Sequence, residues 1–95
     1  METPFYLLFS LKTPDGYDTF GEFTVGTDRE LTYALFDSLK GDKQLREDYH
    51  FHIDLIETVN ALPEKIRSKC CKLDQLGENM KLIAREVYRQ KNLDE

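Results

Sequence analysis

An apolar run close to the N-terminus constrains the fold more than any other part of the sequence. Residues 5–11, Phe-Tyr-Leu-Leu-Phe-Ser-Leu, lie between Pro4 and the turn sequence of residues 13–16. Because successive side chains of a strand point to opposite faces, this run is apolar on both faces. Such a run predicts a central strand that is covered on both sides. The chain's own helices can cover one face, so something else must cover the second.

Composition and charge limit the classes of protein to consider. The chain has 95 residues, of which 40% are hydrophobic, and this predicts a single globular domain spanning residues 1–95. The formal net charge of −5 argues against nonspecific binding of nucleic acid and against docking on anionic membranes. We therefore expect no nucleic-acid or membrane partner.

The positions of the two cysteines and the lack of a recognisable targeting signal indicate the cellular compartment. Cys70 and Cys71 are adjacent, so they cannot link distant parts of the chain, and a reducing compartment fits best. Glu2 stands where a signal peptide carries positive charge, and no apolar run is long enough to span a bilayer. The sequence thus predicts a soluble, cytoplasmic protein.

Turn chemistry predicts a hairpin after the first strand. Residues 14–16, Pro-Asp-Gly, form a loop whose glycine takes the left-handed position, and a second strand follows over residues 17–25. With Tyr17 opposite Thr13, the apolar residues of both strands gather on one face. The other face of the second strand would carry Asp18, Phe20, Glu22 and Thr24.

Two helices are expected. Thr27 and Glu30 have the spacing of a capping box, which predicts a helix over residues 28–40 that Gly41 ends. A second helix, residues 73–91, follows from apolar residues at helical spacing: Leu73, Leu76, Met80, Ile83 and Val87.

Residues 49–57 alternate as a third strand, but the next segment is ambiguous. Residues 64–72 fit a helix begun by Pro63 or a fourth strand with lysines guarding a sheet edge. The strand is favoured because the residues of Ser-x-Cys-Cys include serine and cysteine, which have low helix propensity.

These elements predict an α+β fold of order ββαββα. We expect a two-layer sandwich in which both helices cover one face of a four-stranded antiparallel sheet of strand order 2-1-3-4. This layout is shared by unrelated small bacterial domains and does not carry function.

No set of residues points to catalysis, so the sequence predicts a non-enzymatic protein without a cofactor. It contains no Gly-x-Ser-x-Gly turn, no separated pair of carboxylates and no phosphate-binding glycine loop. His50 and His52 could meet Cys71 at a metal site on the second sheet face, although partly exposed polar residues explain them more simply. A small metal- or ligand-binding regulatory domain using the His50/His52 face is therefore the alternative function.

The second face of the sheet is the predicted interaction surface. It would display Tyr6, Leu8, Phe20, His50, His52 and Ile56 between an acidic edge (Asp18, Glu22) and a basic edge (Lys65, Arg67, Lys69). An apolar centre with a charged rim is typical of a binding surface. We expect a protein-interaction or assembly module that forms a homodimer or binds another protein through this face. In a two-fold dimer each acidic edge would lie over a basic one.

Overall fold

The structure, a computed structural model, describes residues 5–44 and 49–90. The elements follow in the order β1 (Phe5–Thr13), β2 (Gly16–Gly26), α1 (Arg29–Ser38), β3 (Phe51–Val59), β4 (Leu62–Cys71) and α2 (Leu73–Gln90). The strands form one antiparallel sheet of order β2-β1-β3-β4. The predicted α+β fold is confirmed, and the ambiguous segment forms a strand up to Cys71, with Lys72 between β4 and α2. Neither helix in the described part of the chain has the length and apolar character needed to cross a membrane.

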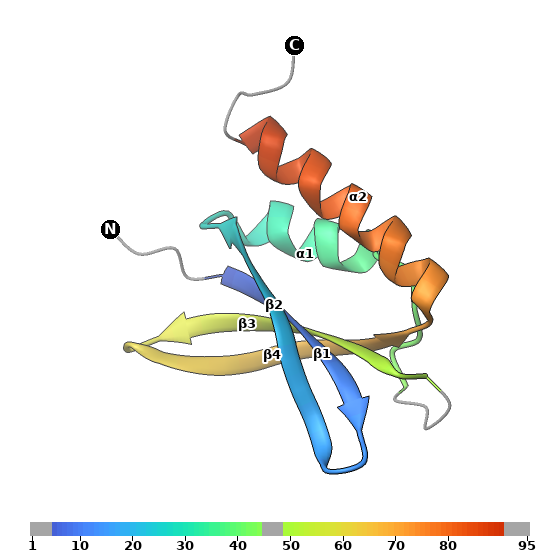
Figure 1. The fold of residues 1–95 in the computed structure, drawn as a ribbon. Coiled ribbons are helices and arrows are strands. Elements are labelled where there is room, and N and C mark those ends of the chain that lie inside the picture. The colour runs from blue at the N-terminus through green and yellow to red at the C-terminus, as the bar shows by residue number, and fades with distance from the viewer. Residues whose placement is uncertain (1–4, 45–48, 91–95) are drawn as a thin grey trace.

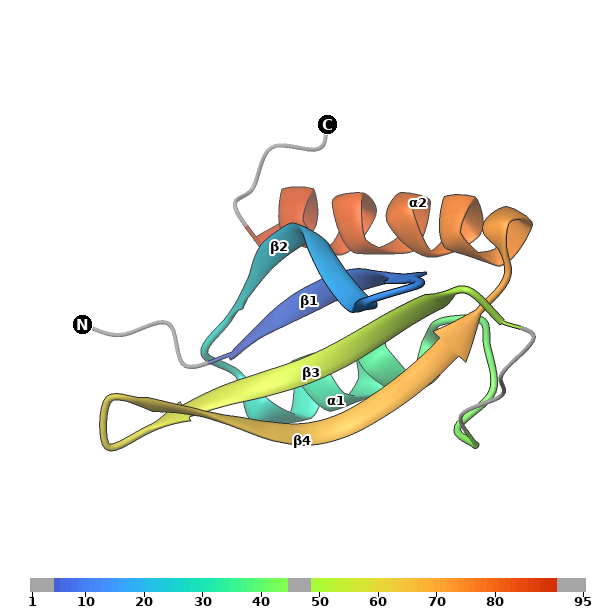
Figure 2. The same ribbon diagram turned by 60° about the horizontal axis from the view of Figure 1, so that its bottom comes forward.

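Both helices lie on the same side of the sheet (Figure 1). Alternate residues of the central strands point toward them and are almost fully buried. The core contains Phe5, Leu7, Phe9, Ile53 and Leu55 from the sheet, Leu35 and Phe36 from α1, and Ile83 from α2. Figure 2 shows the sheet from its other side, with α1 behind β3 and β4. We call this other side the open face.

β2 departs from the predicted register in its first half. Tyr17 pairs with Lys12 rather than with Thr13, whereas Phe9 pairs with Gly21 as expected. The difference is taken up by a β-bulge at Phe20, where one extra residue enters β2. The residues of β2 before the bulge therefore lie on the opposite face from the one that simple alternation predicts.

Both predicted ends of α1 are wrong in detail. The N-terminal cap is Asp28, whose carboxylate accepts a hydrogen bond from the Leu31 backbone N–H at 3.0 Å, so Thr27 does not form a capping box. The helix ends at Ser38 with Leu39 in an extended conformation. Gly41 has a φ of +143°, but it lies beyond the helix, where the chain passes close to Cys70.

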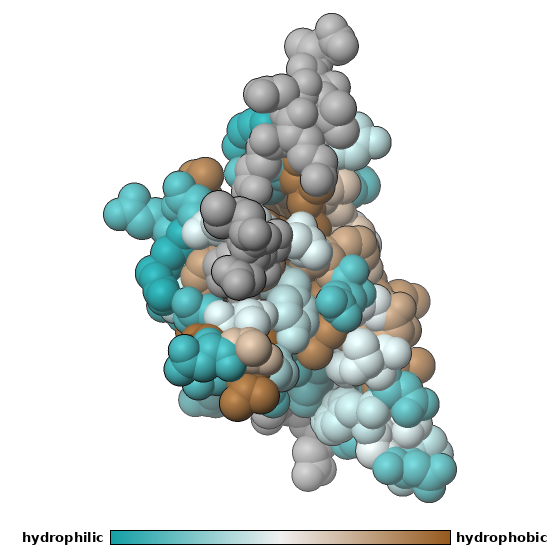
Figure 3. All heavy atoms as spheres, turned by 90° about the vertical axis from the view of Figure 1, so that its left-hand side faces the viewer, coloured by the Kyte–Doolittle hydropathy of each residue, from teal (hydrophilic) through white to brown (hydrophobic). Residues whose placement is uncertain are grey.

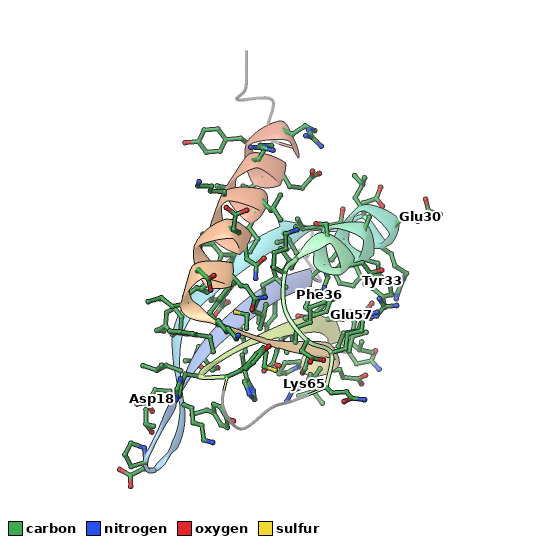
Figure 4. The ribbon with its side chains drawn as sticks, turned by 90° about the vertical axis from the view of Figure 1, so that its right-hand side faces the viewer. Asp18, Glu30, Tyr33, Phe36, Glu57 and Lys65 are labelled. Atoms are coloured by element: carbon green, nitrogen blue, oxygen red, sulfur yellow. The ribbon has the colours of Figure 1, made fainter. Side chains whose placement is uncertain are left out.

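Polar contacts join α1 to the sheet and α2 to the segment that follows α1. Arg29 of α1 donates to Glu57 of β3 at 2.8 Å and to the Tyr33 hydroxyl at 3.1 Å. Tyr33 and Glu57 lie close together in Figure 4, with Phe36 between α1 and the sheet. At the other end of α1, the buried Asn79 side chain of α2 bonds both backbone groups of Lys40. Together with the shared core, these contacts hold both helices on one face of the sheet.

Candidate functional site

Cross-strand pairing defines the side chains of the open face. Tyr6, Leu8 and Ser10 of β1 pair with Ile56, Asp54 and His52 of β3. The neighbouring strands add Tyr17, Thr19, Glu22 and Thr24 from β2 and Lys65 and Ser68 from β4. Lys65 lies on the side of the sheet away from α1 in Figure 4. The face therefore draws residues from all four strands.

An apolar strip runs across the centre of this face. Tyr6 and Ile56 lie directly opposite each other on the two central strands, and Leu8 follows Tyr6 on β1. Ile56 is only 5% exposed, whereas Tyr6 and Leu8 are half-buried. The three side chains make an apolar surface on the side of the sheet that carries neither helix.

Charged and hydroxyl groups surround the strip. Asp54 accepts a hydrogen bond from Ser68 at 2.6 Å and pairs with Lys65 at 3.8 Å. On the other side, Ser10 and Thr19 share a hydrogen bond of 3.3 Å. Among the described residues of the face, Glu22 and Asp54 are matched in charge by Lys12 and Lys65, although the complete chain has a net charge of −5.

His52 forms the polar end of the strip. It is 9% exposed, and its Nε2 has no hydrogen-bond partner among the described residues. The Tyr17 ring stacks on the imidazole with a centroid separation of 4.3 Å. Burial lowers the pKa of His52, a shift that Asp54 opposes and that Lys65 and Lys12 reinforce. The imidazole is therefore held in a setting that favours its neutral form.

Two members of the predicted interaction surface lie elsewhere. The bulge turns Phe20 to the helix side, where its ring lies 6.2 Å from those of Phe9 and Phe51. His50 precedes β3, is exposed and lines a depression with Leu11, Phe51 and Leu73. Of the six residues predicted, the structure brings Tyr6, Leu8, His52 and Ile56 together on the open face.

Of the charged edge residues predicted for this face, three lie on the helix side instead. Asp18 pairs with Leu11 and so lies on the helix side. A bulge near Ile66 turns Arg67 and Lys69 to the same side, where Arg67 pairs with Asp37 at 2.8 Å. Lys69 is 3% exposed, so its side chain is buried and does not project from the edge of the sheet into solvent. Only Glu22 and Lys65 remain as charged edge residues of the open face.

The structure does not assemble the predicted metal ligands. Cys71 packs in the core on the helix side, whereas Cys70 is the residue opposite His52. Across residues 5–44 and 49–90, no three His, Cys, Asp or Glu side chains are grouped so that they could hold a metal ion. The set of His50, His52 and Cys71 is therefore not brought together as one metal site in the described part of the chain.

Both cysteines are fully buried. The Cys70 thiol donates to the backbone carbonyls of Asp42 and Gln44, at 3.6 and 3.3 Å. Burial, with a further contribution from Cys70, raises the pKa of the Cys71 thiol to about 11. These are the properties of structural thiols rather than of a reactive pair.

Sequence reasoning missed a second exposed apolar area on the helix side. Leu11, Phe20 and Leu73 are 38%, 49% and 69% exposed, and Phe51 lies between them. Figure 3, viewed toward the tip of the β3–β4 hairpin, shows further hydrophobic residues separated by hydrophilic ones, as on most protein surfaces. Alternation along β1 already places Leu11 on the helix side, whereas Phe20 is turned there by the bulge, which alternation cannot reveal.

Comparison with protein-family models, with curated proteins and with solved structures gave no match.

Proposed function

We propose that this protein is a non-enzymatic assembly module that self-associates through the open face of its sheet. The observation that carries the proposal is the apolar strip of Tyr6, Leu8 and Ile56, which lies on the side of the sheet opposite both helices. Apolar residues at the centre of a polar rim are typical of surfaces that bind another protein.

The charge pattern supports a second copy of the chain as the occupant. In a two-fold dimer whose axis runs parallel to the strands, β2 of one copy faces β4 of the other, because the order is β2-β1-β3-β4. Glu22 would then face Lys65 of the second copy at both edges. The balanced charge of the face avoids the repulsion that the net charge of −5 would otherwise cause.

An interface of standard size would take a modest share of the chain's surface. A standard interface buries ~800 Å² on each partner. The accessible surface of the chain is 6421 Å², so such an interface would take about an eighth of it. All four strands contribute residues to the open face over which such an interface would extend.

Light scattering after size exclusion tests the proposal. The protein is measured at tens of micromolar, about the Kd range of modest interfaces. We expect the particle in solution to have twice the chain mass of 11.2 kDa, as a dimer does. Leu8→Asp should give a folded monomer, since it places a carboxylate at the centre of the contact beside Asp54. Tyr88→Asp, which changes an exposed aromatic residue of α2, is the matched control and should remain dimeric.

Circular dichroism must show that both variants are folded. A wild-type monomer at these concentrations would contradict self-association. A dimer that survives Leu8→Asp would place the interface on another surface, and a monomer that binds a different protein would replace the second copy with that partner.

A further inference from the structure

His52 is a titratable group of the open face, and its surroundings stabilise the protonated imidazole poorly. The side chain is 9% exposed, and Tyr17 covers one side of the ring at 4.3 Å. No described residue accepts a hydrogen bond from Nε2. A protonated imidazole has an N–H group at both nitrogens, so in the charged ring Nε2 is necessarily a buried donor without an acceptor among the described residues.

Charged and titratable groups face His52 from every strand. They are Lys12 from β1, Tyr17 from β2, Asp54 from β3, and Lys65 and Cys70 from β4. Asp54 alone favours the imidazolium, and that carboxylate is already engaged by Ser68 and Lys65. The two lysines oppose it. The surroundings therefore favour the neutral imidazole near pH 7, and His52 is protonated only at lower pH.

We propose that protonation of His52 is a pH switch that dissociates the assembly. This inference rests on the proposed function, because it concerns the same face. A second copy on the open face would cover Tyr17, which is half exposed, and the remaining exposed part of His52. Covering them removes the solvent that could stabilise an imidazolium, so the contact fits the neutral ring and disfavours the charged one.

Proton linkage sets the size of the effect. Each dimer contains two copies of His52, and each must lose its proton before association if the contact accepts only the neutral ring. With the unperturbed histidine pKa of about 6.5, the Kd would rise by at most ~100-fold between pH 7.5 and 5.5. Because burial already lowers the pKa of His52 in the single chain, we expect the Kd to rise by less than this limit.

Analytical ultracentrifugation of the wild type at pH 7.5 and 5.5 separates the two proposals. A monomer at pH 7.5 contradicts self-association itself. A dimer with the same Kd at both pH values leaves self-association standing and overturns the switch. A rise of the Kd at pH 5.5 supports the switch.

Two variants assign the effect to this residue. His52→Phe keeps a ring beneath Tyr17 but cannot titrate, so its Kd should be independent of pH over this range. His50→Gln removes the exposed histidine and should behave as the wild type. If His52→Phe does not fold, an NMR titration of wild-type histidines decides the matter. The pKa of His52 should be lower in the concentrated dimer than in the dilute monomer, and an equal or higher value would overturn the switch.

Discussion

The ammonium group of Lys69 caps the C-terminal end of α1 through the backbone carbonyl of Phe36, which it reaches at 2.7 Å. The same Nζ donates to the carbonyl of Leu39 at 2.8 Å and lies 3.3 Å from that of Asp37. The last turn of α1 contains no basic residue of its own. A strand distant in sequence therefore supplies the cation that the negative end of the helix favours.

Replacing Lys69 with methionine tests this cap. Lys69→Met keeps most of the buried aliphatic chain but leaves the carbonyls of α1 without their donor. We expect a loss of ~2–3 kcal/mol in the free energy of unfolding, measured with urea. Lys81→Met, on the exposed surface of α2, should change stability by less than ~0.5 kcal/mol. A stable Lys69→Met variant would mean that water satisfies these carbonyls.

The β3–β4 turn contains a residue in an unfavourable conformation. Asn60 and Ala61 have φ values of 53° and 66°, as the central residues of a tight hairpin turn require. Asparagine tolerates this region, but alanine does not. Ala61→Gly should raise the unfolding free energy by ~0.5–1 kcal/mol, whereas Ala34→Gly in α1 should lower it by ~1 kcal/mol. Equal effects of the two substitutions would contradict the assigned turn geometry.

Gly41 occupies a position where a side chain does not fit. Its φ is +143°, and a Cβ atom there would lie 2.5 Å from the backbone oxygen of Cys70. Gly41→Ala should therefore destabilise the protein by at least ~2 kcal/mol, since both the conformation and the contact must change. Gly77→Ala in α2 has open space around the new methyl group and should stabilise by ~1 kcal/mol. Thermal unfolding of both variants provides the comparison.

The buried thiols should be inert in the folded protein. With a pKa of about 11, Cys71 is ionised in only about one molecule in a thousand at pH 8. Cys70 is also inaccessible, because its side chain is fully buried. A thiol-specific disulfide reagent should modify neither residue over minutes in native buffer and both in concentrated urea. Rapid native modification would show that residues 42–44 open away from β4.

The fold was predictable because its strongest signals are periodic. The apolar run of β1 identified a central strand, and the spacing of Leu76, Met80 and Ile83 identified α2 with the correct start. Both signals survive small local changes in the chain. The strand order followed from the symmetry of the two halves, without any contact between specific side chains.

The site was predictable only where the strands alternate without interruption. Tyr6, Leu8, His52 and Ile56 lie on strands that pair residue for residue, and the structure places them on the open face. Bulges in β2 and β4 reversed the sides of Phe20 and Arg67. A bulge depends on packing against neighbouring elements, which alternation along one strand does not encode. Tyr17, which covers His52, was missed for the same reason.

The pH dependence of folding provides a test of the His52 environment that does not need the dimer. Because burial lowers the pKa of folded His52 below the unfolded value of about 6.5, the unfolded chain binds the proton more readily. The contribution of neutral His52 to stability is therefore complete above pH ~6.5 and is lost as the pH falls from there toward the folded pKa.

Urea unfolding between pH 7.5 and 5.5, at concentrations where only the monomer is present, measures this loss. Wild-type stability should decrease over the range, and His52→Phe should flatten the curve, whereas His50→Gln should follow the wild type because its histidine is exposed. Carboxylates titrate mainly below this range and contribute little to the slope. A slope that persists in His52→Phe would mean that another group takes up the proton on unfolding, and that the ring under Tyr17 is free to ionise in the folded chain.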